Sequence, residues 1–277
     1  MTRPIAVRSL VRFHAHSGAP TPDQDLVAVE SPLTVHVQPP DGPSLSLGLL
    51  MRTPGHDEDL VLGALFAEGV IDSMAAVRAV HARSVDEAEE VTVDVTAAAQ
   101  IAAMVGRGST STSACGLCGR LEVIALATAP ALVQSTDTPS VTAATLHALP
   151  DRLRASQAAF AETGGLHAAG VFTRDGILQV LREDVGRHNA VDKVVGALLR
   201  AGAIPAAEAV LVVSGRVAYE IVQKATRAGI PLILAVGAPT DLAVDAARAA
   251  GITLAGFARD DRFNVYTWPG RIGDYSP

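Results

Sequence analysis

The sequence predicts an α/β protein in two halves, an α+β N-terminal half and a C-terminal half in which helices cover a mixed sheet. In the C-terminal half, apolar runs alternate with segments whose apolar residues recur at helical spacing, which is typical of such a sheet. The length of 277 residues fits one or two domains of about 150 residues. We expect a loosely ordered, polar lead-in over residues 1–25, an α+β domain over 26–135 and an α/β domain over 136–277.

The first half carries alternating segments around one helical pattern. Residues 33–38 place Leu33, Val35 and Val37 on one face, and residues 44–52 follow as a partner strand after a PPDGP turn. Residues 56–70 begin with three acids near a helix start, where negative charge complements the dipole. A strand over 91–95, a helix over 96–105, a Gly/Ser/Thr-rich exposed loop over 106–120 and a helix over 120–128 complete this half.

The second half begins with a hairpin over 167–184, whose turn is signalled by Asp175-Gly176. An amphipathic helix over 189–202 follows, and then strands over 209–215, 231–237 and 252–258 alternate with helices over 217–229 and 241–251. Ligands bind beyond the carboxyl ends of the strands in sheets of this kind. Those ends are Ser214-Gly215-Arg216, Gly237-Ala238-Pro239 and Phe257-Ala258-Arg259.

The composition excludes several classes of partner. The chain has 22 Lys and Arg against 29 Asp and Glu, for a net charge of -7. An acidic protein is a poor match for nucleic acid or an anionic membrane surface. No apolar run reaches the length of about 18 residues that spans a membrane, and none resembles the core of a signal peptide. We therefore expect a cytoplasmic protein that binds neither nucleic acid nor membrane.

The only two cysteines form a C-x-x-C motif at Cys115 and Cys118, which is compatible with three chemistries. A structural zinc site needs four ligands, and neither His167 nor His188 has the spacing to complete one. A thioredoxin-like dithiol follows a core strand, whereas this pair follows a Gly/Ser-rich loop. A cysteine that carries sulfur as a persulfide suits an exposed loop. Arg120 and the following helix favour the thiolate of Cys115, which leaves Cys118 as an auxiliary thiol.

Zinc-dependent deamination does not fit the sequence. Those enzymes combine H-x-E with a later P-C-x-x-C. Here His167 is followed by two alanines, and the C-x-x-C precedes it without a proline. We expect no metal held by the protein itself.

An ordered set of segments resembles the formate dehydrogenase accessory sulfurtransferase family, FdhD. The segments are RTPGHDEDLVLGALFAEGVI (52–71), TSACGLCGR (112–120), GLHAAGVF (165–172), REDVGRHNAVDKVVG (182–196), SGRVAYEIVQKA (214–225) and GFARDDRFNVYT (256–267). The resemblance implies that a cysteine desulfurase loads a persulfide onto Cys115. The sulfur then passes to the molybdenum or tungsten of the bis(molybdopterin guanine dinucleotide) cofactor, before formate dehydrogenase receives it. The resemblance also implies a homodimer and a cytidine-deaminase-like second half.

The family's contact with the guanine dinucleotide maps to Phe257, Ala258, Arg259, Asp260, Asp261 and Arg262. The chemistry of these residues suits that ligand. The two arginines can donate to phosphate oxygens, Phe257 can stack on a purine, and either aspartate can accept from guanine N1 and N2. The alternative is a solvated hairpin tip whose charges have no specific role.

Two further questions stay open at this stage. His167 and the cluster Asp184, Arg187, His188 and Asn189 either line the cofactor site or serve as helix caps and structural hydrogen-bonding groups. Two functions other than sulfur transfer also remain: delivery of the molybdenum cofactor by a binding chaperone, and a dithiol oxidoreductase.

Overall fold

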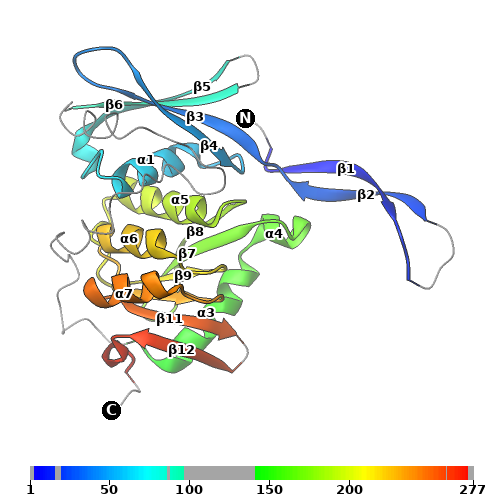
Figure 1. Ribbon diagram of the computed structural model, residues 1–277, viewed down its shortest axis with the longest axis vertical. Helices are drawn as coiled ribbons and strands as arrows, with labels where there is room; N and C mark the ends of the chain where they lie inside the picture. Colours follow the sequence, from blue (N-terminus) through cyan, green and yellow to red (C-terminus); the bar gives the residue numbers. More distant parts are fainter. Residues whose placement is uncertain (1–2, 16–19, 86–87, 97–140, 260, 274–277) are drawn as a thin grey trace.

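The computed structural model describes residues 3–15, 20–85, 88–96, 141–259 and 261–273 (Figure 1). These residues form a two-stranded, a four-stranded and a six-stranded sheet. The α/β fold class is confirmed. Within the described part of the chain, no helix is long and apolar enough to cross a membrane.

The four-stranded sheet belongs to the first half of the chain. Its order is β4-β3-β6-β5, with β3 antiparallel to β4 and parallel to β6. The bounds are β3 Ser31–Gln38, β4 Leu45–Arg52, β5 Val77–Val85 and β6 Ala88–Val95. Leu33, Val35 and Val37 are buried together, as their alternation predicts. Of these four strands, only β5 has no counterpart among the predicted strands.

The lead-in predicted over residues 1–25 is ordered where the structure describes it. β1 (Ile5–Arg12) and β2 (Thr21–Ala28) pair antiparallel along their whole length and project from the body as an arm (Figure 1). Most of their residues are exposed on both faces. The prediction was wrong here, because polar and turn-forming residues such as those of β2 do not exclude a strand that is ordered by pairing with its neighbour.

The six-stranded sheet forms the second half in the order β12-β11-β10-β9-β7-β8. Its middle strands β9, β10 and β11 are parallel, whereas β7, β8 and β12 pair antiparallel with their neighbours. The mixed sheet predicted for this half is confirmed. The bounds are β7 His167–Thr173, β8 Leu178–Asp184, β9 Ala209–Val213, β10 Leu232–Ala235, β11 Thr253–Arg259 and β12 Arg262–Thr267.

Helices cover both faces of this sheet (Figure 1). One face packs with residues of α5 (Arg187–Arg200), α6 (Tyr219–Arg227) and α7 (Asp241–Ala249). This core continues into α1 (Asp57–Ala67) and the four-stranded sheet. The other face packs against α3 (Ala143–Ala155) in a smaller core. The short helix α4 (Ala158–Thr163) leads into β7, and two 3₁₀ turns cover Met74–Ala76 and Pro269–Arg271.

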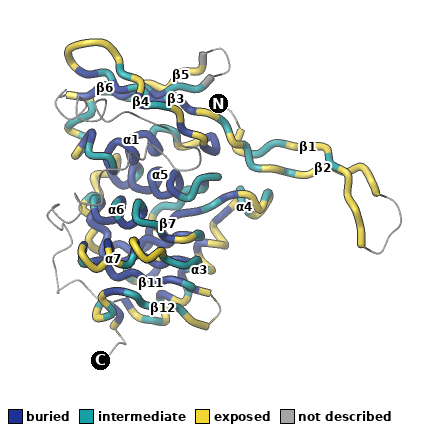
Figure 2. Tube along the Cα trace, in the orientation of Figure 1, coloured by how far each residue is buried: buried dark blue, intermediate teal, exposed yellow. Residues whose placement is uncertain are grey.

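The crossing of α1 (Asp57–Ala67) with α5 joins the two halves and is unusually close. A Cβ atom on Gly63 would lie 1.9 Å from the carbonyl oxygen of Asp192, and one on Gly196 would lie 1.9 Å from that of Asp59. The two backbones therefore touch through a pair of glycines. α1 has the three acidic residues expected in its first turn, and it is buried along most of its length (Figure 2).

α5 differs from the amphipathic helix that the sequence predicts, because it is buried on nearly every side. Two of its charged residues, Asp192 and Lys193, are paired within the core. Lys193 Nζ lies 2.7 Å from Asp184 Oδ2, with side-chain exposures of 1% and 0%, and Asp192 accepts from Lys224 Nζ at 2.6 Å. Charged residues that look solvent-facing in the sequence thus serve as internal hydrogen-bonding partners.

Residues 97–140 lie outside the described residues. This segment contains Cys115 and Cys118, most of the helix predicted over 96–105, the loop over 106–120 and the helix over 120–128. The expected boundary between domains at residues 135 and 136 lies there too, and it stays a prediction.

Candidate functional site

The carboxyl ends of three parallel strands meet at one edge of the six-stranded sheet, as the alternating pattern predicts. Backbone hydrogen bonds join the loops that follow these strands. Gly237 N donates to Gly215 O at 3.1 Å, and Phe257 N donates to Gly237 O at 3.0 Å. Because a Cβ on Gly237 would lie 2.8 Å from Gly215 O, only glycine permits this approach. Ser214 Oγ accepts from Ala168 N at 2.9 Å, which brings the start of β7 to the same edge.

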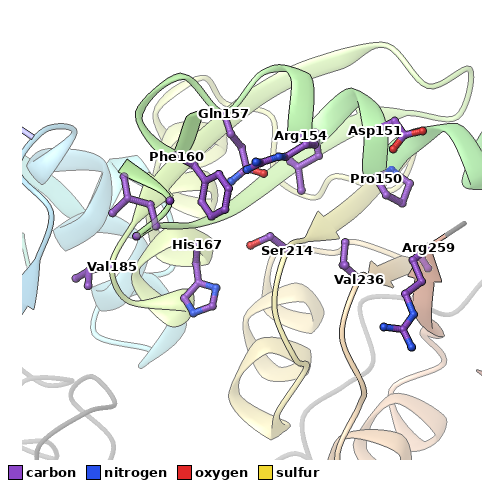
Figure 3. Close-up of a pocket in the computed structure, with 15 residues that line it drawn as sticks. Pro150, Asp151, Arg154, Gln157, Phe160, His167, Val185, Ser214, Val236 and Arg259 are labelled. Carbon is purple, nitrogen blue, oxygen red and sulfur yellow. The ribbon is translucent and has the colours of Figure 1, made fainter. Parts of the chain in front are cut away.

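A pocket of about 620 Å³ opens at this edge (Figure 3). Its floor comes from Ser214 after β9, Val236 after β10 and the last two residues of β11. Its opposite wall comes from α3, α4 and the loop before β7. In Figure 3, Ser214 and Val236 lie between the His167 ring and the Arg259 guanidinium. The lining residues are Pro150, Asp151, Leu153, Arg154, Gln157, Phe160, Gly164, Gly165, Leu166, His167, Val185, Ser214, Val236, Ala258 and Arg259.

An irregular hairpin shapes the strand β11 side of the pocket. Phe257 has φ of 54°, a left-handed conformation that disfavours residues with a side chain. The β11–β12 register shifts between Gly256 and Arg259, so the chain bulges at Phe257 and Ala258. Ala258 and Arg259 consequently line the pocket. Backbone strain of this kind gathers at functional sites.

The six residues expected to contact the cofactor fall into three groups. Ala258 and Arg259 line the pocket. Phe257, Asp261 and Arg262 are not among its described lining residues; Asp261 and Arg262 are exposed beside the hairpin tip. Asp260 lies outside the described residues. Of the five that the structure describes, two therefore line the pocket.

His167 contributes a neutral imidazole to the pocket. Burial, and next the charge of Arg187, lower the pKa of His167 from 6.5, against the opposing effect of Asp184. Burial, and next the charges of Arg187 and Lys224, lower the pKa of His188 to about 3. At neutral pH each neutral ring has one nitrogen that donates and one that accepts.

The α3–α4 wall was not foreseen from the sequence. The Arg154 guanidinium lies 3.8 Å above the centre of the Phe160 ring, a cation–π contact that fixes both side chains. The Glu183 carboxylate accepts from the backbone amides of Ala159 and Phe160 at 3.0 and 2.7 Å, and this anchors α4. No motif marks these residues, because their position depends on how α3 and α4 fold over the sheet.

The structure assigns structural roles to Asp184 and Asn189. Asp184 is fully buried and accepts from Thr53 N at 3.1 Å and Gly186 N at 2.8 Å. Asn189 Nδ2 donates to Asp184 at 2.9 Å and to Met51 O at 2.8 Å. Neither residue is among the described lining residues of the pocket. Neither residue is the N-cap of α5, which is Gly186; Asp184 instead accepts from the backbone nitrogen of that N-cap residue.

Three comparisons relate this chain to known proteins. Residues 28–273 match the model of the FdhD/NarQ family. A sulfur carrier protein FdhD from Mycolicibacterium paratuberculosis is 41% identical over 94% of this chain and 96% of its own length. A sulfur carrier protein FdhD from Sulfurisphaera tokodaii is 40% identical over 97% of this chain and 100% of its own length. One from Nocardia farcinica is 45% identical over 91% of this chain and 90% of its own length.

A solved structure from Desulfotalea psychrophila, described as a formate dehydrogenase accessory protein, has the same fold. It superposes with a TM-score of 0.74, covers 97% of this chain and 99% of its own, and is 24% identical. The family model covers most of the chain, and these relatives have sequence identities of 40% or more over nearly the full length. This chain belongs to the FdhD/NarQ family.

Proposed function

We propose that this protein is a sulfurtransferase that carries sulfur as a persulfide on Cys115. The observation that carries the proposal is the C-x-x-C motif, at Cys115 and Cys118, in a chain about 40% identical to sulfur carrier proteins over nearly its full length. The donor is a cysteine desulfurase. The acceptor is the bis(molybdopterin guanine dinucleotide) molybdenum cofactor, which is bound as substrate and then supplied to formate dehydrogenase.

The chemistry requires a nucleophilic thiolate. The Cys115 thiolate attacks the outer sulfur of the desulfurase persulfide, an S–S bond forms on Cys115, and the desulfurase cysteine leaves as a thiolate. Transfer of that outer sulfur to the cofactor breaks the new S–S bond and leaves its electron pair on Cys115 as the thiolate. A reduced molybdenum or tungsten centre of the substrate would accept the sulfur through a metal–sulfur bond and would supply the two electrons that convert it to the sulfide level. Arg120 lies two residues after Cys118 in the sequence, and a nearby cation favours the thiolate form.

The pocket beside β9, β10 and β11 suits the guanine dinucleotide part of the substrate. It combines apolar walls with a few polar groups, which is typical of small-molecule sites. Arg259 can donate to a diphosphate as a forked donor. The neutral His167 and the Ser214 hydroxyl can hydrogen-bond to ribose or base without adding charge. We further propose that Phe257, Asp261 and Arg262 contact the parts of the ligand that extend beyond the pocket.

The loading step has a direct test. The purified protein is incubated with a cysteine desulfurase and cysteine, and its intact mass is measured before and after reduction. We expect the wild type to gain the mass of one sulfur atom, reversibly, and Cys115→Ala to gain none. Cys118→Ala serves as the matched control, because it keeps the primary thiol. No gain on the wild type, or equal gain on Cys115→Ala, would refute persulfide transfer.

A second candidate is a delivery chaperone that binds the cofactor without transferring sulfur. The pocket favours keeping it, because the described lining residues Arg259, His167 and Ser214 can bind a ligand by themselves. Complementation of a strain lacking this gene separates the two functions. A chaperone would still yield active formate dehydrogenase with Cys115→Ala but not with Arg259→Ala, whereas a sulfur carrier would fail with both. We also propose that the protein acts as a homodimer in the cytoplasm.

A further inference from the structure

The β1–β2 arm is the least covered part of the described structure. It forms a sheet of its own and projects away from both larger sheets (Figures 1 and 2). Its base is tied to the body where β2 contacts α4, and Val29 N donates to Pro4 O at 2.8 Å. A two-stranded hairpin alone in water is marginally stable at best, so its extension calls for an explanation.

The two faces of the arm differ in character. Residues directly opposite in an antiparallel pair share a face. One face consequently carries the charged residues Arg8, Arg12, Asp23 and Asp25, with Ala6, Leu10, Thr21 and Val27 between them. Arg8 lies opposite Asp25, and Arg12 is paired to Asp23 at 2.9 Å. Its charges are balanced within the arm. The other face carries mainly apolar residues, namely Ile5, Val7, Ser9 and Val11 of β1 with Pro22, Gln24, Leu26 and Ala28 of β2.

The apolar face is open to solvent. Val7 is 55% exposed and Val11 is 56% exposed, and Phe13, one residue beyond β1, is 78% exposed. Scattered apolar residues are ordinary on a protein surface, but an ordered row of them marks an interaction site. The unpaired outer edges of β1 and β2 add hydrogen-bonding groups along the same ribbon.

A second apolar surface lies near the base of the arm. Leu49 and Met51 on the edge strand β4 are 54% and 46% exposed, and their positions two residues apart place them on one face of the strand. β4 pairs with β3, whose first residue Ser31 lies opposite Arg52. Ser31 comes three positions after Ala28, the last residue of β2, so β4 lies close to the base of the arm. One chain thus carries both an apolar arm and an apolar patch at its base.

We propose that the arm is a dimer clasp, whose apolar face packs on the Leu49–Met51 face of a second copy of this chain. The proposal rests on the homodimer of the proposed function and locates its interface. When two arms lie antiparallel about a two-fold axis, the tip of each reaches the base of the other, where Leu49 and Met51 lie. The same contact then occurs twice.

The area available favours a second copy over a foreign protein. The eight residues of β1 span about 27 Å, and a two-stranded ribbon is about 10 Å wide, so one arm face offers roughly 270 Å². Covering it with another protein would bury roughly 540 Å² in total, well below the ~1,200 Å² of stable specific interfaces. Two reciprocal arms bury roughly 1,100 Å², which approaches that value.

The test measures the oligomeric state of the full chain by sedimentation velocity over a concentration series. The clasp variant is Val7→Thr, Val11→Thr and Phe13→Thr, since threonine keeps the β-branched shape that suits a strand. Leu49→Thr with Met51→Thr changes the receiving surface. The control, Ile177→Thr with Leu242→Thr, alters two other exposed apolar residues. Thermal unfolding checks that each variant is folded.

We expect a wild-type dimer, a control as tight as the wild type, and dimerisation weakened by more than about 100-fold in either clasp variant, because each substitution acts at two symmetric contacts. A folded clasp variant that dimerises as tightly as the wild type would overturn the clasp alone. A monomeric wild type would overturn both the clasp and the homodimer, while leaving the persulfide measurement as an independent test of sulfur transfer.

Discussion

The close crossing of α1 and α5 predicts that Gly196→Ala destabilises the protein, although alanine is the better helix former. The new Cβ would lie 1.9 Å from the Asp59 carbonyl oxygen, where real Cβ contacts are essentially never shorter than 3.0 Å. A flexible side chain could rotate away from such a clash. A backbone carbonyl inside α1 cannot, so the two helices must separate by about 1 Å.

The cost of that separation follows from the burial of the interface. A gap of ~0.5–1 Å forfeits a quarter to a half of the dispersion attraction across it, and α1 is buried along nearly its whole length. Overpacking costs ~1–3 kcal/mol, and we take the upper value because backbone meets backbone. Against this loss, alanine stabilises a helix by ~1 kcal/mol relative to glycine. The net loss is about 2 kcal/mol, which lowers the Tm by about 4–8 °C in a protein of this size.

Thermal and urea unfolding followed by circular dichroism provide the measurement. Ala197→Gly, the adjacent position in α5, is the matched control and should cost about 1 kcal/mol through helix propensity alone. Gly63→Ala meets the reciprocal clash with Asp192. Because one helix displacement relieves both clashes, the double variant should lose less than the sum of the single losses. A Gly196→Ala protein as stable as the wild type, or more stable, would refute the close crossing.

Three further predictions concern charge. Lys193→Met leaves the buried Asp184 carboxylate without its cation and should cost about 3–5 kcal/mol in urea unfolding; a loss under 1 kcal/mol would contradict the pairing. Because the folded pKa of His188 is about 3 and the unfolded value is ~6.5, the unfolded chain binds the proton first as pH falls. Stability should therefore decline from pH 6.5 towards pH 3, by up to about 4–5 kcal/mol, and His188→Gln should flatten this decline; an unchanged slope would contradict it. Arg259→Ala should weaken binding of guanosine diphosphate about tenfold in calorimetry, whereas Arg248→Ala on α7 should not, and equal affinities would remove Arg259 from the site.

The sequence predicted those elements whose apolar pattern reflects one-sided or complete burial. Leu33, Val35 and Val37 alternate because one face of β3 is covered. The apolar runs of β9, β10 and β11 indicate strands covered on both faces, which the helices on either side of the sheet confirm. The edge where their carboxyl ends meet followed from topology alone, and the pocket lies there.

The elements that were missed or described wrongly depend on strand pairing, buried ion pairs or long-range contacts. The spacing of apolar residues in the sequence does not reveal these. β1 and β2 are ordered by pairing with each other while most of their residues stay exposed, so their polar and turn-forming sequence did not predict strands. Lys193 and Asp192 look like solvent-facing residues of an amphipathic helix, yet each has an internal partner of opposite charge. Arg154 and Phe160 reach the pocket only because α3 and α4 fold over the sheet, a long-range contact that no local motif encodes.

The buried network at Asp184 makes a pocket of C-terminal residues depend on the N-terminal half. Asp184 accepts from Thr53 N of the first half and binds Lys193 of α5. Lys193 Nζ in turn donates to Thr53 O at 2.8 Å. α5 begins at Arg187, whose charge helps keep His167 neutral at the pocket wall. Removing residues 51–53 would leave a buried carboxylate and a buried ammonium short of partners, at the start of the helix that carries Arg187. The shape and protonation of the pocket therefore require both halves, and the C-terminal half alone is not expected to bind the cofactor.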